Sequence, residues 1–321
     1  MHKSKCPVCH SLKTIKYGSR NGKQTYKCTE CGYRFRNTHT PTPDDLWRLY
    51  QENKQTVSEL SARFNLSPST IKRRLSEVSK TWVQPPLSGG GFVHLDATNW
   101  AHKWGVMIGL DALTGFPLYM EFIKNETNAD YVAAVNSIEA RGYEIKGLII
   151  DGKKSLFKIF AGYKIQMCQF HMKQIIRRYL TNNPRLKASR ALKEMVGSLT
   201  SSLKENFEQD YTEWKKEWKD TLSKRSILKS GKEQYTHKRL HSAMSSMNFY
   251  LPYLFTYQLP ECQGMPNTNN KLEGTFTDLK KNVNNHSGMI EENRKRFIIG
   301  FFLALVEAHS MSGCNKKQDP L

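Results

Sequence analysis

The sequence has no long apolar run, and nowhere in its 321 residues does a hydrophobic stretch approach membrane-spanning length. Its first residues, Met-His-Lys-Ser-Lys-Cys, also lack the apolar segment of a secretory signal peptide. Both absences predict a cytoplasmic protein without a membrane partner. Disulfide bonds are rare in that compartment, so the seven cysteines do not predict a disulfide framework.

Acidic residues are scarce as well. The chain has 29 Asp and Glu against 49 Lys and Arg, a net charge of +20, which favours a polyanionic partner such as nucleic acid. Charge alone would equally suit an RNA-binding or ribosome-associated protein. The excess is uneven, because residues 1–85 carry +10 and residues 172–265 carry +8, whereas residues 86–171 carry 0. This pattern is expected of a neutral catalytic core flanked by two DNA-binding parts.

Four of the cysteines form two Cys-x-x-Cys pairs, Cys6 with Cys9 and Cys28 with Cys31, separated by 18 residues. Each pair places two thiolates on one side of a tight turn, and two pairs supply the four tetrahedral sulfur ligands that zinc prefers. We predict a zinc ribbon over 1–37 that holds one structural Zn²⁺, since no coordination position stays open for catalysis. Two basic side chains of this ribbon are candidates for DNA phosphate contacts, Arg34 and Arg36.

After a polar linker, residues 43–82 contain three helix starts. Thr42 and Ser67 are capping residues that each precede a proline, and Thr56 with Glu59 forms a capping box. Their spacing suits a helix-turn-helix domain whose last helix enters the DNA major groove. A small three-helix packing module with a basic solvent face is the alternative. The residues of the last helix that are predicted to contact DNA are Lys72, Arg73 and Arg74.

A stretch rich in proline and glycine over 83–91 separates this domain from the next. Short connections predict an antiparallel meander of three strands. A crossover helix capped by Asn128 should then bring a fourth strand, 145–151, parallel to the first, 92–96. Residues 91–171 are therefore predicted to form the first part of an α/β catalytic core.

The remaining sequence has helical patterns. Residues 172–265 show no convincing strand, which predicts an all-helical insertion. The core should resume over 266–309 with a glutamate-bearing helix and an apolar closing helix, and we expect a disordered tail over 310–321. Within the insertion, Trp214 and Trp218 share one helical face, where core packing and stacking on a displaced base are the two candidate roles.

Three carboxylates are predicted to converge. Asp96 and Asp151 each end an apolar strand, and neighbouring parallel strands would put these ends side by side. Glu273 lies on the helix that follows the insertion. Such hard oxygen ligands suit Mg²⁺ or Mn²⁺, and three of them can hold the two ions of a phosphoryl-transfer site. Asp111 is the competing acid, but the Ala-Leu-Thr-Gly that follows it favours a hairpin-turn role.

The strand layout, Asp151-Gly followed by Cys168-Gln-Phe-His171, and Thr268-Asn-Asn-Lys-Leu-Glu273 resemble the D-D-E transposases of bacterial insertion sequences in the Mutator-like superfamily. The resemblance covers the chain from the zinc ribbon to the closing helix. It implies an RNase H-like catalytic domain with an all-α insertion, and the three carboxylates as the Mg²⁺ triad. It further implies cleavage at terminal inverted repeats to give 3′-hydroxyl ends, and transfer of those ends into target DNA.

The family's Cys-x-x-His motif falls on Cys168 and His171. His171 is predicted either to act in catalysis by contacting the scissile phosphate or to support the turn from strand to helix. Several basic residues near the expected site are candidates for phosphate contacts, with ordinary solvated charge as the alternative: Lys153, Lys154, Arg177, Arg178, Lys280 and Lys281.

Two rival functions fit parts of the sequence. A domesticated, non-catalytic DNA-binding regulator would keep the ribbon and the helix-turn-helix but would not need the carboxylates. An RNase H-like nuclease would need the carboxylates but no end-recognising module. Because the sequence has both, it favours the transposase, which would associate with the nucleoid. Two DNA ends must be joined, so we expect a homodimer on double-stranded DNA.

Overall fold

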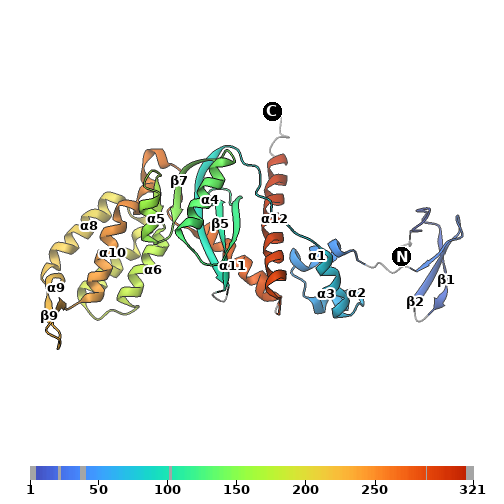
Figure 1. Ribbon diagram of the computed structural model, residues 1–321, viewed down its shortest axis with the longest axis horizontal. Helices are drawn as coiled ribbons and strands as arrows, with labels where there is room; N and C mark the ends of the chain where they lie inside the picture. Colours follow the sequence, from blue (N-terminus) through green and yellow to red (C-terminus); the bar gives the residue numbers. More distant parts are fainter. Residues whose placement is uncertain (1–4, 21–22, 37–40, 101–102, 287, 316–321) are drawn as a thin grey trace. The chain divides into compact units, whose positions relative to one another are not determined.

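A computed structural model describes residues 5–20, 23–36, 41–100, 103–286 and 288–315, and the side chains of Arg20, Lys23, Arg36 and residues 310–315 lie outside this description. The chain divides into two compact units, residues 1–79 and 80–321 (Figure 1). No helix in the described part of the chain is both long enough and apolar enough to cross a bilayer.

The first unit begins with a small antiparallel sheet. Its strands are β1 (Thr14–Arg20), β2 (Lys23–Cys28) and β3 (Arg34–Arg36), in the order β1-β2-β3. The buried side chains of this sheet and its flanking loops are only Cys6, Cys28 and Phe35 among the described residues, with Tyr26 packed against them. So small an apolar core needs a further stabilising element.

Three helices follow in the first unit, α1 (Pro43–Gln51), α2 (Val57–Phe64) and α3 (Pro68–Glu77). The predicted N-caps are confirmed, because Thr42, Thr56 and Ser67 each accept a hydrogen bond from a backbone N–H of the first turn. The buried apolar residues of the three helices form one small core: Leu46, Trp47, Tyr50, Leu60, Ile71 and Leu75.

The second unit is α/β and contains a five-stranded mixed sheet. Its strands are β4 (Gly90–Trp100), β5 (Trp104–Asp111), β6 (Pro117–Ile123), β7 (Glu144–Ile150) and β8 (Ile165–Met167), in the order β6-β5-β4-β7-β8. The first three strands are antiparallel neighbours, and β7 is parallel to both β4 and β8. The predicted meander and the predicted parallel fourth strand are therefore confirmed.

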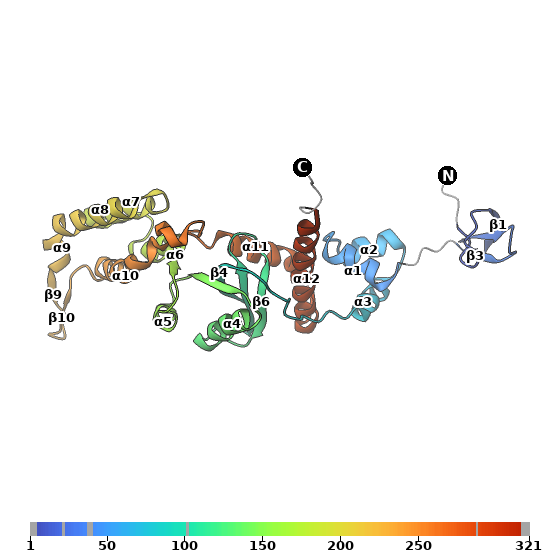
Figure 2. The same ribbon diagram turned by 90° about the horizontal axis from the view of Figure 1, so that it is seen from above.

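Helices cover both faces of this sheet. The crossover helix α4 (Asn128–Ala140) and the glutamate-bearing helix α11 (Asn270–Asn285) lie on opposite sides (Figure 2). The cap of α4 was predicted one residue too late, because Thr127 rather than Asn128 is its N-cap and forms a capping box with Asp130. A short helix, α5 (Lys154–Ile159), joins β7 to β8.

The closing helix α12 runs over Glu291–Asn315, past the predicted boundary at 309. The sequence just after that boundary contains neither proline nor glycine until Gly313, so nothing in it stops the helix. Residues 316–321 of the predicted tail lie outside the described residues. Near the start of the second unit, the Trp82 ring packs edge-on against the Phe302 ring, with 6.4 Å between their centroids. Residues 80–82 therefore belong to the second unit, although they were predicted to belong to the helix-turn-helix domain.

The insertion is mostly helical, with α6 (Gln169–Leu180), α7 (Lys187–Gly197), α8 (Lys204–Glu217), α9 (Lys219–Ser223) and α10 (Lys238–Leu254). The prediction that it is all-helical is wrong in one place, since β9 (Arg225–Ile227) and β10 (Glu233–Tyr235) form a hairpin. These strands are three residues long, too short for an alternating pattern, and Gly231 makes their turn at φ +79°.

The insertion and the sheet share one hydrophobic core. Buried residues of α6, α7, α8 and α10 pack in the same cluster as those of β4, β7 and α4. Trp214 belongs to this core at 3% exposure, and its indole N–H donates to the Ala188 carbonyl at 3.0 Å. Trp214 therefore has a core-packing role in this structure. Trp218 is half-buried and packs against the same core.

Candidate metal centre and nucleic-acid interface

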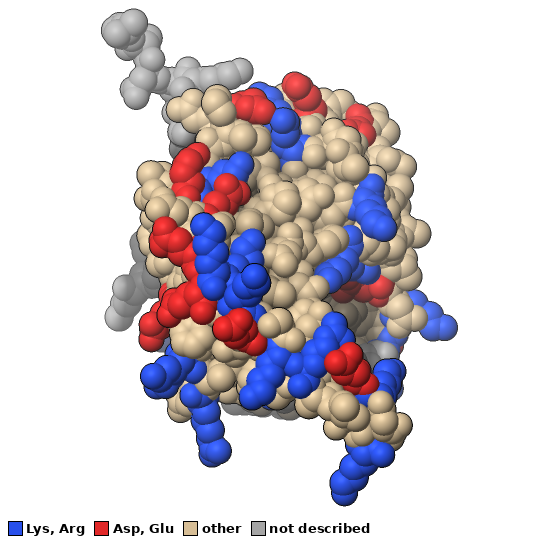
Figure 3. Space-filling view, turned by 90° about the vertical axis from the view of Figure 1, so that its left-hand side faces the viewer, with Lys and Arg blue, Asp and Glu red and all other residues tan. Residues whose placement is uncertain are grey.

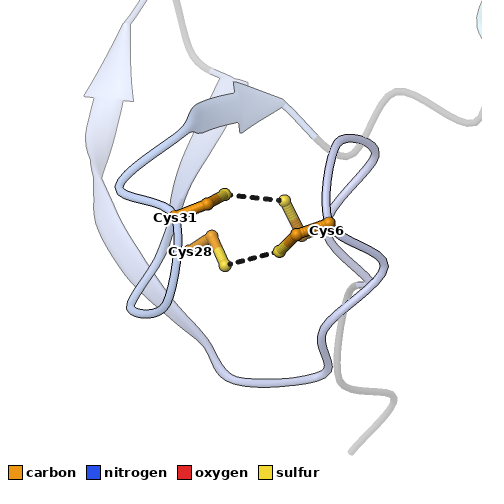
Figure 4. A group of neighbouring side chains, drawn as sticks. Cys6, Cys28 and Cys31 are labelled. Carbon is orange, nitrogen blue, oxygen red and sulfur yellow. Dashed lines mark hydrogen bonds between the residues drawn. The ribbon is translucent and has the colours of Figure 1, made fainter.

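The four N-terminal cysteines form a compact cluster. Cys6 Sγ lies 3.6 Å from Cys31 Sγ, and Cys9 Sγ lies 3.5 Å from Cys28 Sγ, so each contact joins one Cys-x-x-Cys pair to the other (Figure 4). All four sulfur atoms lie within 4.8 Å of one another. Four sulfurs around zinc at about 2.3 Å would be about 3.8 Å apart at tetrahedral angles. The cluster is compatible with one structural zinc ion.

The thiols of this cluster differ in acidity. Burial raises the pKa of Cys6, but backbone hydrogen bonds from Cys9 and Val8 outweigh it and lower that pKa to about 7. The pKa of Cys9 is raised to about 12, because burial and the neighbouring sulfurs outweigh a backbone hydrogen bond from Ser11. Without a cation the four sulfurs therefore do not ionise together, and a bound dication would relieve their repulsion.

The two predicted aspartates sit level with each other in the second unit. His94 on β4 is paired with Ile149 on the parallel strand β7. β7 ends at Ile150, and Asp151 follows it directly. If this register is continued by two residues, Asp96 and Asp151 fall side by side on one face, and the charge of Asp151 does act on Asp96. Both carboxylates are half-buried.

Asp96 and Asp151 both have raised pKa values. Loss of hydration and the nearby charge of Asp151 raise the pKa of Asp96 to about 8. Burial likewise raises the pKa of Asp151 above its usual range. In the described part of the chain neither forms an ion pair, and their hydrogen bonds come only from backbone N–H groups, Ala97 to Asp96 at 2.7 Å and Lys153 to Asp151 at 3.2 Å. The positive charge of His171 lowers both pKa values and that of Lys153 lowers the pKa of Asp151, but burial outweighs them. Two half-buried acids whose pKa values stay raised form a site that a further cation would stabilise.

Glu273, the third predicted carboxylate, projects from the first turn of α11. Its Oε1 lies 3.2 Å from Nε2 of His171, near the start of α6. The sulfur of Cys168 and the Glu273 carboxylate raise the pKa of His171 to about 10, so it is protonated at neutral pH. In turn, the imidazolium lowers the pKa of Glu273. The charges of His171 and Glu273 also act on Asp96, so the four groups form one electrostatic cluster.

The donor set of this cluster suits a hard divalent cation. Carboxylate oxygens are the ligands that Mg²⁺ and Mn²⁺ prefer. Among the described His, Cys, Asp and Glu residues, however, only the four cysteines form a group of three or more whose ligand atoms all lie within 4.8 Å of one another. The three carboxylates are therefore more widely spread, with Glu273 held by His171. A two-ion site tolerates this spread, because its ions themselves lie about 3.5–4 Å apart.

A clamp of hydrogen bonds fixes where α11 begins. The backbone N–H of Gln169 donates to the Asn267 carbonyl at 3.0 Å, and the Asn267 amide donates back to Gln169 Oε1 at 3.0 Å. The Asn269 N–H donates to Cys168 Sγ at 3.1 Å. Gln169 also donates to the Leu254 carbonyl at 2.7 Å. Cys168 and Gln169 thus hold the end of the insertion and the start of the Glu273 helix against the sheet.

No sequence pattern pointed to Gln169 and Asn267, or to a second group beside Asp151. Lys153 pairs with Glu126 at 3.1 Å and lies 5.1 Å from the ring centroid of Tyr131. Glu126 raises the pKa of Asp151 and accepts a hydrogen bond from the Tyr131 hydroxyl. Glu126 stands in a loop without periodic pattern, so only the folded chain brings it to the site.

The turn after Asp151 also contacts the insertion. Tyr250 on α10 donates its hydroxyl hydrogen to the Gly152 carbonyl at 2.5 Å. A Cβ at Gly152 would lie 2.6 Å from Cδ1 of Ile175, so a larger residue there would have to displace the end of the Ile175 side chain on α6. Packing therefore favours glycine after Asp151.

Some predicted DNA contacts of the first unit have partners within the protein. On α3, Lys72 is exposed, Arg73 is exposed and pairs with Glu77 at 2.5 Å, and Arg74 donates to the Pro41 carbonyl at 2.6 Å. Arg74 therefore has a tethering role in this structure. In the ribbon, the guanidinium of Arg34 stacks 4.2 Å from the centroid of the exposed Tyr17 ring, and the side chain of Arg36 lies outside the described residues.

The predicted phosphate contacts of the second unit are mostly exposed. Lys153 forms an ion pair with Glu126, and Lys154 Nζ lies 4.9 Å from the centroid of the Phe249 ring. The remaining four are exposed, on the last turn of α6 and the last turns of α11: Arg177, Arg178, Lys280 and Lys281.

Replacing Gln169 by leucine is expected to destabilise the second unit. The change removes the bonds to Leu254 and Asn267, each worth about 0.5–1.5 kcal/mol, although the Leu254 carbonyl still accepts from Gln166 and the Asn267 amide still donates to Thr200. Urea unfolding followed by far-UV circular dichroism measures this loss. Gln209→Leu, on the exposed face of α8, is the control and should change stability by less than about 0.5 kcal/mol. Equal losses for both variants would contradict the clamp.

No model of a known protein family matches the sequence. A search of curated proteins likewise finds no similar sequence.

Proposed function

We propose that the chain is a D-D-E transposase that cleaves DNA at the ends of an insertion sequence and joins those ends to target DNA. The observation that supports the proposal is the parallel register of β4 and β7, which brings Asp96 and the residue after β7, Asp151, close enough for the charge of Asp151 to raise the pKa of Asp96. The pKa values of both acids stay raised although the charge of His171 acts on them, and such perturbed carboxylates are candidates for metal binding.

The sheet supports an RNase H-like assignment for the core. Its order, β6-β5-β4-β7-β8, has three antiparallel strands followed by two parallel ones, with the acids at the central pair. Glu273 comes from a helix on the face opposite α4, after a long helical insertion. This is the arrangement that the D-D-E resemblance implies, with β9 and β10 as a small departure from an all-α insertion.

In the proposed site, the three carboxylates would hold Mg²⁺ or Mn²⁺. Two bound ions would activate a hydroxyl or water for attack and stabilise the leaving oxygen. The protein's own groups position this centre. The clamp of Gln169 and Asn267 sets the start of α11, and His171 holds the Glu273 carboxylate. The proton on His171 also offsets negative charge when no metal is bound.

The first unit supports DNA recognition in this proposal. A zinc ribbon and a helix-turn-helix domain would bind the terminal inverted repeats, with Lys72 and Arg73 on the exposed side of α3 and Arg34 on the ribbon. The net charge of +20 suits a double-stranded DNA partner and a place at the nucleoid. Because two ends are joined, we expect the active form to be a homodimer on DNA.

A mobility assay tests the proposal. The gene with its native flanking DNA is introduced into a host, and excisions and new insertions are scored by sequencing for the wild type, Asp151→Ala and Asp278→Ala. Asp278 is an exposed acid on α11 and serves as the control. We expect insertions from the wild type and from Asp278→Ala, and a loss to background for Asp151→Ala.

The other outcomes separate the rival functions. If none of the three proteins gives excisions or new insertions but all bind the flanking DNA specifically, a domesticated DNA-binding regulator would be favoured. Cleavage of RNA or of junction DNA that Asp151→Ala abolishes, without new insertions, would favour an RNase H-like nuclease.

A further inference from the structure

The helical insertion has a cleft far along the chain from the carboxylates. It has a volume of about 490 Å³ and lies where the C-terminal end of α6 meets the first turns of α7 and α10. Neither the metal centre nor the predicted DNA contacts involve its lining. The residues that matter for its chemistry are Arg185, Ser189, Lys238 and Arg239.

Two helix N-termini open into this cleft. The N-cap positions are Leu186 for α7 and His237 for α10, and neither side chain caps its helix. The first N–H groups of both helices therefore keep their hydrogen-bonding capacity, and both helix dipoles present their positive ends. Paired N-termini of this kind favour an anion.

A serine side chain lines the same cleft. Ser189, in the first turn of α7, is 6% exposed. Its hydroxyl makes no hydrogen bond to any residue that the structure describes, and its oxygen is not one of the fully buried unpaired polar atoms, so it stays open to solvent. A serine hydroxyl beside free backbone N–H groups is a ready donor to a phosphate oxygen.

The charges around the cleft have one sign. Arg185, Lys238 and Arg239 line it, and no Asp or Glu does so among the described residues. The α6 carbonyls would repel an anion, but Arg239 covers one of them by donating to the Arg178 carbonyl at 2.7 Å. Seen from the end of the insertion, Lys and Arg side chains predominate over the lower half of this face (Figure 3).

We propose that this cleft binds one phosphate group through the first turns of α7 and α10, the Ser189 hydroxyl and the cations of Arg185 and Lys238. A phosphate of the DNA backbone and a free phosphate ion share the required chemistry. The assignment of the ligand as a DNA phosphate rests on the proposed function. The existence of the phosphate site does not, because binding requires no cleavage.

The test uses the full-length, zinc-loaded protein without Mg²⁺, so that no cleavage occurs. The first arm titrates fluorescent duplex DNA of random sequence at several salt concentrations. It compares the wild type, an Arg185→Gln/Lys238→Gln double variant, and a Lys219→Gln/Lys224→Gln double variant. The control lysines are exposed in the same insertion, outside the cleft, and match the change in charge. For every phosphate that the protein no longer neutralises, the slope of log K against log salt should fall by about 0.9.

The second arm measures thermal unfolding with inorganic phosphate against chloride at equal ionic strength. It uses the wild type and Ser189→Asp, which places a carboxylate where the anion would bind. An aspartate in the first turn also suits the helix dipole, so this variant should fold. We expect phosphate to raise the Tm of the wild type and not that of Ser189→Asp.

The outcomes separate the ligand sources. A reduced slope for the cleft variant alone supports binding of a DNA phosphate. A phosphate-dependent Tm that Ser189→Asp abolishes, with unchanged slopes, supports a site for a free phosphate ion. Equal slopes in both double variants, together with no phosphate effect or the same effect in Ser189→Asp, would overturn the site. None of these results depends on the mobility assay.

Discussion

Removal of zinc is expected to unfold the ribbon sheet β1–β3 and leave the five-stranded sheet of the second unit folded. The ribbon's described core consists of Cys6, Cys28 and Phe35 with Tyr26 against them, too little apolar area to hold three short strands. Its four thiols already face one another at metal-binding distances. In small zinc-binding domains of this kind, the metal contributes the folding energy.

Hydrogen exchange measured by mass spectrometry gives the readout. Amides of residues 5–36 should lose protection when a chelator is added, whereas those of residues 90–167 should keep it. Cys28→Ser should reproduce this pattern with zinc present and should lower the bound zinc below one ion per chain. Cys262→Ser removes a buried cysteine of the second unit and is the control, with zinc content unchanged. Protection of residues 5–36 that persists without zinc would contradict the prediction.

Replacing Asp96 by asparagine is expected to abolish metal-dependent DNA cleavage and, without Mg²⁺, to stabilise the protein. The folded-state pKa of Asp96 is raised to about 8 from its ordinary value of 3.8, so the folded state holds a proton that the unfolded state has released. In the wild type, stability should therefore fall as pH rises from about 4 through 8, and the full cost is present above pH 8. Asparagine stays uncharged at every pH, so the stability of the Asp96→Asn variant does not fall through ionisation at this position.

Thermal unfolding between about pH 5 and pH 9 measures the difference, because this range spans the raised pKa of Asp96. The Tm advantage of Asp96→Asn should grow with pH in zinc-loaded protein without Mg²⁺, and it should shrink when Mg²⁺ is added, because only the wild type gains a tightly held ion. Asp278→Asn is the control and should follow the wild type in both stability and cleavage. A Tm difference that is independent of pH would contradict the raised pKa, and retained cleavage would contradict the catalytic role.

Local patterns in the sequence were sufficient for much of the fold. The predicted cap at Thr42 and the predicted capping box of Thr56 with Glu59 both form, and Thr42 also forms a capping box with Asp45 that was not predicted. The meander and the parallel β7 follow from short connections and the right-handed crossover. The cap of α4 was predicted at Asn128, and the spacing of Thr127 and Asp130, which form the observed capping box, was overlooked in the sequence.

Contacts between distant residues could not be predicted in the same way. The clamp joins Gln169 to Asn267 across the whole insertion, and Arg74 on α3 donates to the carbonyl of Pro41, which lies before α1. Both depend on how elements pack, which periodicity does not encode. The strand-end acids depend less on packing, since the parallel pairing of β4 with β7 was predicted and, continued by two residues, it brings Asp96 next to Asp151. The distances among the three carboxylates likewise depend on packing and could not be predicted.

Helix α10 connects the phosphate cleft to the carboxylate site. It begins at the cleft with Lys238, and its Tyr250 donates to the carbonyl of Gly152, next to Asp151. Its only proline, Pro252, lies beyond that contact, so the segment between them has no break. At about 1.5 Å per residue it spans about 18 Å, which is about five base pairs of duplex DNA. If the cleft holds a backbone phosphate and the carboxylates cleave DNA as proposed, α10 would set the distance between the bound phosphate and the cleavage site.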